Sequence, residues 1–165
     1  MAEQVPVTMV NHVALEMAAA PDAVWREILS DYVEAKKFRE FGTIEPLDDP
    51  AATLGGYRMR FEQDGVVDER IVHITERDDT ARRLSVMADY LSVPGGMRVY
   101  ATYHAREAAG GTSYAIDCHT SVKVDAPAGG DGPDLAAAVA EMTSGADVHL
   151  NAYLASIKAR VEMPG

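Results

Sequence analysis

Hydrophobic and polar positions divide the chain into a strand-like middle and a helical C-terminal end. Between residues 55 and 124, apolar and polar residues alternate in short runs that are separated by turn sequences rich in Gly and Asp. Such alternation is typical of strands that bury one face. From residue 133 to 161, apolar residues recur every three or four positions, which predicts one long amphipathic helix. The pattern predicts an α+β fold in which a curved antiparallel sheet and a long helix enclose a space.

The first fifty residues predict a strand at 7–17 followed by two short helices. Pro21 suits the first position of a helix, because its missing N–H would be unpaired there in any case. Asp31 is expected to cap the second short helix. Six more strands are predicted at 41–47, 57–63, 67–76, 83–91, 97–106 and 112–124.

Composition narrows the class of protein. The length of 165 residues suits a single domain spanning 1–165, in which the Pro- and Gly-rich stretch 125–133 is expected to be a mobile linker. With 15 Lys and Arg against 26 Asp and Glu, the net charge of −11 argues against nucleic acids and anionic membrane surfaces as partners. Cys118 is the only cysteine and the N-terminus shows no leader pattern, so we expect a cytoplasmic protein. A homodimer is compatible with the sequence.

No familiar catalytic or cofactor motif is present. The histidines fall on different predicted elements and lack metal-ligand spacing, so we expect no metal site. The sequence has neither a G-x-S-x-G motif nor a phosphate-binding glycine loop. We therefore expect a protein that works without a cofactor. The five histidines are His12, His73, His104, His119 and His149.

The order of the elements carries a family resemblance. Ala20-Pro21-Asp22-Ala23-Val24-Trp25 follows the first strand, and Gly56-Tyr57-Arg58 opens the third. Glu69-Arg70-Ile71 leads to Arg83-Leu84-Ser85, and a loop around Pro94 leads into Tyr100. In this order the segments resemble the START/polyketide-cyclase-like (SRPBCC) superfamily, whose helix-grip fold is shared with the major birch-pollen allergen and plant hormone receptors. The resemblance spans nearly the whole chain.

The resemblance implies a cavity between sheet and helix that binds hydrophobic or aromatic ligands. Some members of the superfamily are cyclases, aromatases, dehydratases or lyases, and others only carry or sense a ligand. Both hypotheses remain open for this chain: an enzyme that transforms an aromatic or polyketide-like molecule by acid–base chemistry, or a carrier or sensor. A structural protein with a collapsed cavity is a third, weaker hypothesis.

The strand at 97–106 decides how polar the cavity is. One face of this strand carries Val99, Ala101 and Tyr103, and the other face carries a polar set. Composition alone would place the polar set in solvent, whereas the resemblance implies that the tyrosine after the proline loop points into the cavity. We expect the polar set to face inward, with a solvent-facing strand as the alternative. The polar set consists of Arg98, Tyr100, Thr102 and His104.

Acid–base roles are assigned on this basis. The resemblance places Glu69 inward, and alternation puts His73 on the same face. Glu69 or His104 is the candidate general acid or base, while Arg98 and Tyr100 would donate hydrogen bonds to substrate oxygens. Thr102 and His73 are substrate-binding candidates, and the alternative for Glu69 is an exposed ion pair with a neighbour.

Other residues complete the predicted lining. The strand at 83–91 should supply an apolar wall that includes Tyr90, and the apolar set of the last strand should face inward. That leaves Asp117 and His119 outside, unless a bulge turns the strand. Asp147 and Asn151 flank the apolar stripe of the long helix, where a solvated position is the alternative. The full set of further lining candidates is Glu40, Met59, Phe61, Val86, Tyr90, Asp147 and Asn151.

Overall fold

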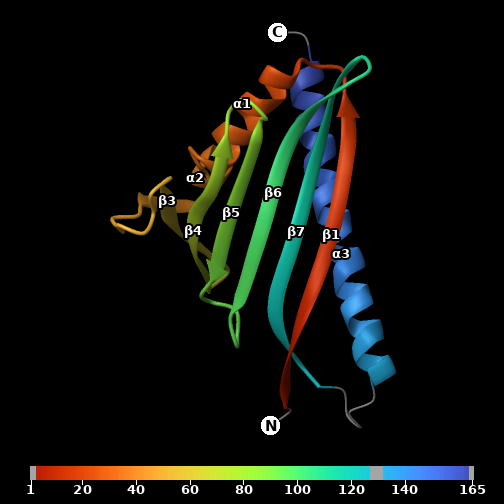
Figure 1. The fold of residues 1–165 in the computed structure, drawn as a ribbon. Helices are drawn as coiled ribbons and strands as arrows, with labels where there is room; N and C mark the ends of the chain where they lie inside the picture. Colours follow the sequence, from red (N-terminus) through yellow and green to blue (C-terminus); the bar gives the residue numbers. More distant parts are fainter. Residues whose placement is uncertain (1–2, 127–131, 164–165) are drawn as a thin grey trace.

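In the computed structural model, which describes residues 3–126 and 132–163, a seven-stranded antiparallel sheet carries helices on one face (Figure 1). The strand order is β1-β7-β6-β5-β4-β3-β2, so only β1 joins a strand distant from it in sequence. This confirms the predicted α+β class and the strand count. The strands are β1 (Gln4–Met17), β2 (Gly42–Pro46), β3 (Gly56–Gln63), β4 (Val66–Asp78), β5 (Arg83–Tyr90), β6 (Met97–Ala108) and β7 (Gly111–Asp125).

Helix α1 (Pro21–Tyr32) begins with proline, as the sequence predicts, and is followed by the single turn α2 (Lys36–Arg39). The predicted cap at Asp31 is wrong, because Asp31 lies inside α1 and is only 2% exposed. It occupies the buried stripe of the helix, one position before Tyr32. The long helix α3 (Gly132–Glu162) has nearly the predicted bounds.

Alternation correctly predicts the facing of several strands. On β5, Leu84, Val86 and Ala88 are buried, and on β7 Tyr114 and Ile116 are completely buried. The outer face of β7 carries Asp117, His119 and other polar residues, as predicted without a bulge. The inward faces form one continuous apolar core under the helices.

The facing of β6 is opposite to our expectation. Ala101, Tyr103 and Ala105 are buried, and the ring of Tyr103 stacks on that of Tyr32 from α1 at 3.8 Å between centroids. The polar set therefore lies on the outer face, where Tyr100 is 47% exposed. The physical reason is burial: the apolar set gains more from being covered by α1 than the polar set would. Arg98, Tyr100, Thr102 and His104 do not line the inner face.

The facing of β4 is also opposite to our expectation. Arg70, Val72 and Ile74 point inward, so Glu69 and His73 lie on the outer face with Ile71. The outer neighbour of Glu69 is Arg58 on β3, and the Nε and Oε1 atoms of this pair are 3.4 Å apart. The structure thus shows the alternative for Glu69, an ion pair with a neighbour.

Helix α3 runs along β1 and is anchored at both halves (Figure 1). Leu154 and Ile157 are fully buried in its C-terminal half. In its N-terminal half, the buried Asn11 of β1 donates hydrogen bonds to the Thr143 carbonyl at 3.0 Å and to Asp147 Oδ1 at 2.8 Å. These bonds satisfy a polar side chain that would be costly to bury alone.

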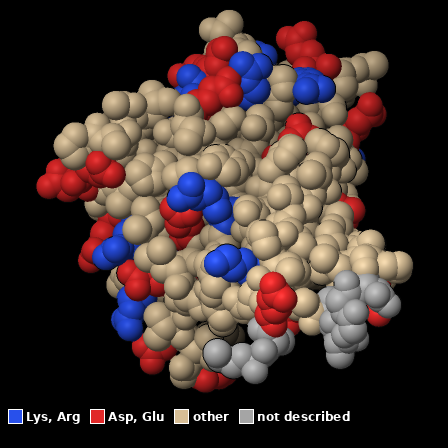
Figure 2. All heavy atoms as spheres, turned by 60° about the horizontal axis from the view of Figure 1, so that its bottom comes forward, with Lys and Arg blue, Asp and Glu red and all other residues tan. Residues whose placement is uncertain are grey.

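The surface mixes charges of both signs. Figure 2 shows basic and acidic side chains close to one another among uncharged atoms. The predicted linker at 125–133 falls largely on residues 127–131, which lie outside the described residues. Within residues 3–126 and 132–163, no helix is both long and apolar enough to cross a membrane.

Candidate functional site

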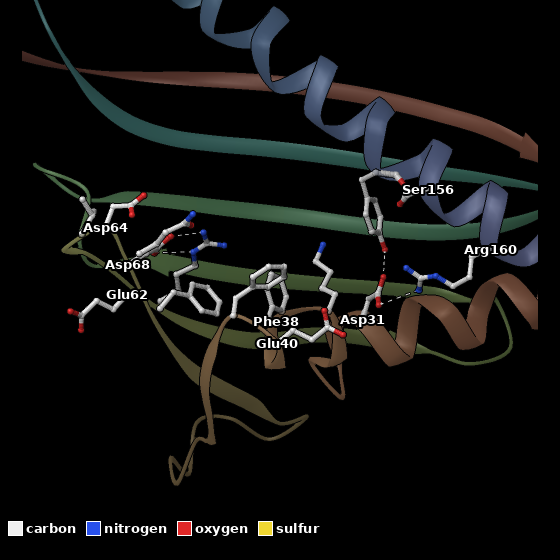
Figure 3. Close-up of a pocket in the computed structure, with 15 residues that line it drawn as sticks. Asp31, Phe38, Glu40, Glu62, Asp64, Asp68, Ser156 and Arg160 are labelled. Atoms are coloured by element: carbon white, nitrogen blue, oxygen red, sulfur yellow. Dashed lines mark hydrogen bonds and ion pairs between the residues drawn. The ribbon is translucent and has the colours of Figure 1, made fainter.

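A cavity of about 1070 Å³ opens between α2, the ends of β3 and β4, and the C-terminal half of α3 (Figure 3). Its volume is close to the upper limit of small-molecule sites, about 1,000 Å³. Three segments that are distant in sequence supply its lining, which is mainly aromatic and charged. The lining residues are Asp31, Lys37, Phe38, Glu40, Phe41, Phe61, Glu62, Gln63, Asp64, Val66, Asp68, Arg70, Tyr153, Ser156 and Arg160.

One end of the cavity is closed by a contact between α1 and α3. The Tyr153 hydroxyl donates a 2.7 Å hydrogen bond to Asp31 Oδ2. Arg160 lies on the other side of the carboxyl group, with its Nη1 3.8 Å from Asp31 Oδ1 and 2.6 Å from Glu27 Oε2. The buried Asp31 is therefore held by a hydroxyl and a cation from the same helix (Figure 3).

Lys37 lies in the middle of the site, surrounded by aromatic rings. Its Nζ donates a 2.8 Å hydrogen bond to the Tyr32 hydroxyl and lies 4.2 Å from the ring centroid of Tyr153 and 4.9 Å from that of Phe38. Burial lowers the pKa of Lys37 from 10.5 to about 8, and Asp31 only partly opposes this effect. Near neutral pH the amine and ammonium forms of Lys37 are therefore close in free energy.

The other end of the cavity carries a fixed guanidinium group. Arg70 makes two hydrogen bonds to Asp68, from Nε at 3.1 Å and from Nη2 at 2.6 Å. The guanidinium carbon also lies 4.3 Å from the ring centroid of Tyr90 and 5.6 Å from that of Phe61. This paired geometry orients the positive charge of Arg70 rigidly beside the cavity.

Buried tyrosines of the core pack next to the cavity lining, and one of them, Tyr32, contacts Lys37. Burial raises the pKa of Tyr32, Tyr103 and Tyr114 well above the usual range, so their hydroxyls stay neutral into strongly alkaline solution. The Tyr114 hydroxyl lies 3.5 Å from that of Tyr153. The site thus offers neutral hydroxyl groups next to one titratable amine.

The opening of the cavity mixes exposed apolar side chains with acidic and polar ones, among them Glu62, Gln63 and Asp64. Phe41, just before β2, is 68% exposed, and Val66 at the start of β4 is 69% exposed. Both line the opening, whereas most large apolar residues of the chain are covered. These two exposed apolar side chains can contact a hydrophobic ligand as it enters.

The structure separates the residues predicted for the site. Phe61 and Glu40 line the cavity. Met59 and Val86 face inward but are packed in the core, and Tyr90 lies behind Arg70. The expectation that the remaining candidates line the cavity is wrong. On the outer face of the sheet lie Glu69, His73, Arg98, Tyr100, Thr102 and His104; on α3, Asp147 bonds to β1 and Asn151 is exposed.

Sequence reasoning missed two ionisable residues of the site, Asp31 and Lys37. The signal for Asp31 was present, because it falls on the apolar stripe of α1 three residues after Ile28, where a charge needs a partner. Lys37 gives no comparable signal, since it follows Lys36 in a helix of one turn. Among the described residues, no three His, Cys, Asp or Glu side chains gather as a metal site.

No protein-family model matches this sequence, and no curated protein matches it. Solved structures match over most of the chain. A truncated norcoclaurine synthase from Thalictrum flavum is 19% identical with a TM-score of 0.57, and the match covers all of both chains. Ara h 8.0201 is 14% identical with a TM-score of 0.57, covering 91% of this chain and 99% of that one.

A third similar structure is the di-domain ARO/CYC BexL from the BE-7585A biosynthetic pathway. It is 18% identical with a TM-score of 0.61 over 96% of this chain, which corresponds to 51% of BexL. At these identities the matches show the fold. They confirm the predicted helix-grip fold, with its curved sheet and long C-terminal helix.

Proposed function

We propose that the protein binds a small aromatic or polyketide-like molecule in this cavity and transforms it by proton transfer, as a cofactor-independent cyclase, dehydratase or lyase. The proposal rests on the surroundings of Lys37. Its amine lies among aromatic rings, and burial lowers the pKa of Lys37 to about 8. A general acid or base works best when its pKa is near the working pH. Lys37 meets this condition inside a cavity of suitable size.

The walls suit a flat ligand. Phe38, Phe61 and Tyr153 line the cavity from three different elements, so an aromatic ring can stack or meet them edge to face. Two similar structures support an aromatic or polyketide-like ligand. A norcoclaurine synthase structure holds dopamine and hydroxybenzaldehyde, and BexL carries the designation ARO/CYC. Lys37 would exchange the proton, while Arg70 would favour negative charge on a ligand oxygen.

The test is a comparison of two neighbouring lysines. Wild type, Lys37→Met and Lys36→Met are incubated with hydroxylated aromatic compounds and linear polyketones, with binding followed by calorimetry and products by mass spectrometry. Lys36 is the control because its side chain is 64% exposed and pairs with Glu34. We expect Lys37→Met to lose at least about 100-fold in turnover, the lower limit of acid–base catalysis, and Lys36→Met to behave as wild type.

Three results would change the proposal. Tight binding by the wild type without any product would favour the carrier or sensor function. Equal turnover in all three proteins would show that Lys37 is not the proton-transfer group. Failure of every aromatic compound to bind would refute the ligand class itself.

A further inference from the structure

We propose that Lys37 is a nucleophilic amine and that the cavity takes aromatic aldehydes or ketones, which become attached to its Nζ as an imine. This inference rests on the proposed function, because it requires the same cavity to admit an aromatic molecule. It goes further by naming the carbonyl group as the feature that the site recognises.

Lys37 differs from the other three lysines of the chain. Lys36 pairs with Glu34 at 3.2 Å and Lys158 with Glu162 at 3.0 Å, while Lys123 is exposed. The Lys37 Nζ has no carboxylate oxygen within 4.0 Å among residues 3–126 and 132–163. Its hydrogen bond goes to the neutral Tyr32 hydroxyl. An amine without a carboxylate partner in a desolvated pocket is the kind that attacks carbonyl carbons.

The aromatic rings favour the product as well as the amine. The Nζ lies 4.3 Å from the ring centroid of Tyr32, 4.9 Å from that of Phe38 and 4.2 Å from that of Tyr153. A protonated imine at Nζ would keep its positive charge against these three ring faces. An aromatic group attached through the imine carbon would extend into the cavity toward Phe61, which is also part of the lining.

The chemistry needs no oxidant and no cofactor. The lone pair of the neutral amine forms the C–N bond while the C=O π electrons move to oxygen, which takes up a proton. The nitrogen then loses a proton, and the resulting carbinolamine expels its hydroxyl group as water after a further protonation. Amine and carbonyl compound thus give imine and one water molecule. The Tyr32 hydroxyl, 2.8 Å from Nζ, accepts a hydrogen bond from the nitrogen and so fixes its position in the cavity.

The test traps the imine. Wild-type protein is incubated with benzaldehyde and sodium cyanoborohydride, which reduces an imine to a stable secondary amine, and the intact mass and peptide masses are measured over time. We expect a gain of one benzyl group on Lys37 at least about 10-fold faster than on the three other lysines, which act as internal controls. Labelling at equal rates on all four lysines, or fastest on Lys36, would overturn the proposal.

A second arm separates this inference from the proposed function. Benzyl alcohol has the same ring but no carbonyl group, and calorimetry measures its binding to the wild type. We expect the wild type to bind it, and we expect neither Lys37→Arg nor Lys37→Met to gain the fast label with benzaldehyde. Binding of benzyl alcohol without selective labelling of Lys37 would refute the imine and leave the cavity proposal standing. If the wild type neither binds benzyl alcohol nor is labelled selectively at Lys37, both the imine and the cavity proposal are refuted.

Discussion

The charge state of Lys37 should make protein stability depend on pH in a way that a single variant can isolate. Lys37→Met removes the amine and keeps a flexible apolar side chain of similar length. Burial holds the pKa of Lys37 at about 8 in the folded protein, against 10.5 without that burial. Between these two pH values the unfolded chain binds more protons at this position than the folded chain does. The free energy of unfolding of wild type must then rise with pH over this window.

The magnitude follows from the width of the window. From pH 8 to 10.5 is about 2.5 pH units, and each unit corresponds to 1.36 kcal/mol, so the full effect is about 3 kcal/mol. Below pH 8 Lys37 is charged in both states and the cost of burying the charge is fully present. Above pH 10.5 it is neutral in both states and the cost is absent. Lys37→Met has no ionisable group at this position, so its stability carries no such cost at any pH.

Urea unfolding of both proteins from pH 7 to 10.5 measures this effect. The quantity of interest is the unfolding free energy of wild type minus that of Lys37→Met, since tyrosines and other groups that titrate in this range contribute equally to both. We expect this difference to increase by about 2–3 kcal/mol between pH 7.5 and 10.5. A difference that stays constant, or falls, would show that Lys37 is solvated and would remove the basis for its chemistry.

Three further predictions concern stability and facing. Tyr153→Phe removes the hydroxyl that bonds to the buried Asp31, so we expect a loss of about 1–3 kcal/mol in urea unfolding; an unchanged midpoint would mean that water replaces the hydroxyl. Asn11→Ala breaks both hydrogen bonds between β1 and α3 and should cost about 1–3 kcal/mol, whereas the exposed control Asn151→Ala should stay within about 0.5 kcal/mol. Arg98→Ala, on the outer face, should leave ligand binding within about twofold in calorimetry, and a tenfold loss would contradict the observed facing.

The sequence predicts the fold well because its signals are local and repeated. Alternation marks each strand, and the stripe that includes Leu154 and Ile157 marks the long helix, with bounds close to those observed. Several residues contribute to each of these signals, so one ambiguous position does not change the predicted element. Asp31 is the exception, because Asp is a common helix cap and its burial on the apolar stripe of α1 is explained only by the tertiary contact with Tyr153.

The site is harder to predict because facing is a property of the whole sheet. Alternation divides β6 correctly into two sets but does not say which set is covered, and the family resemblance favoured the wrong one. The buried Ala101 and Ala105 were a better guide, because small residues leave room for the rings of Tyr32 and Tyr103 to stack. Lys37 could not be singled out in advance, since its environment arises only when α2 meets α3 and the sheet.

The contact between Asp31 and Tyr153 joins residues 122 positions apart, so the cavity exists only when the first helix and the last have both docked. A bound molecule would therefore resist unfolding of the entire chain rather than of one loop. At 100 times its dissociation constant such a molecule adds about 2.7 kcal/mol to the unfolding free energy. Cellular proteases act largely on unfolded chains. The lifetime of this protein in the cell would then follow the supply of its small molecule.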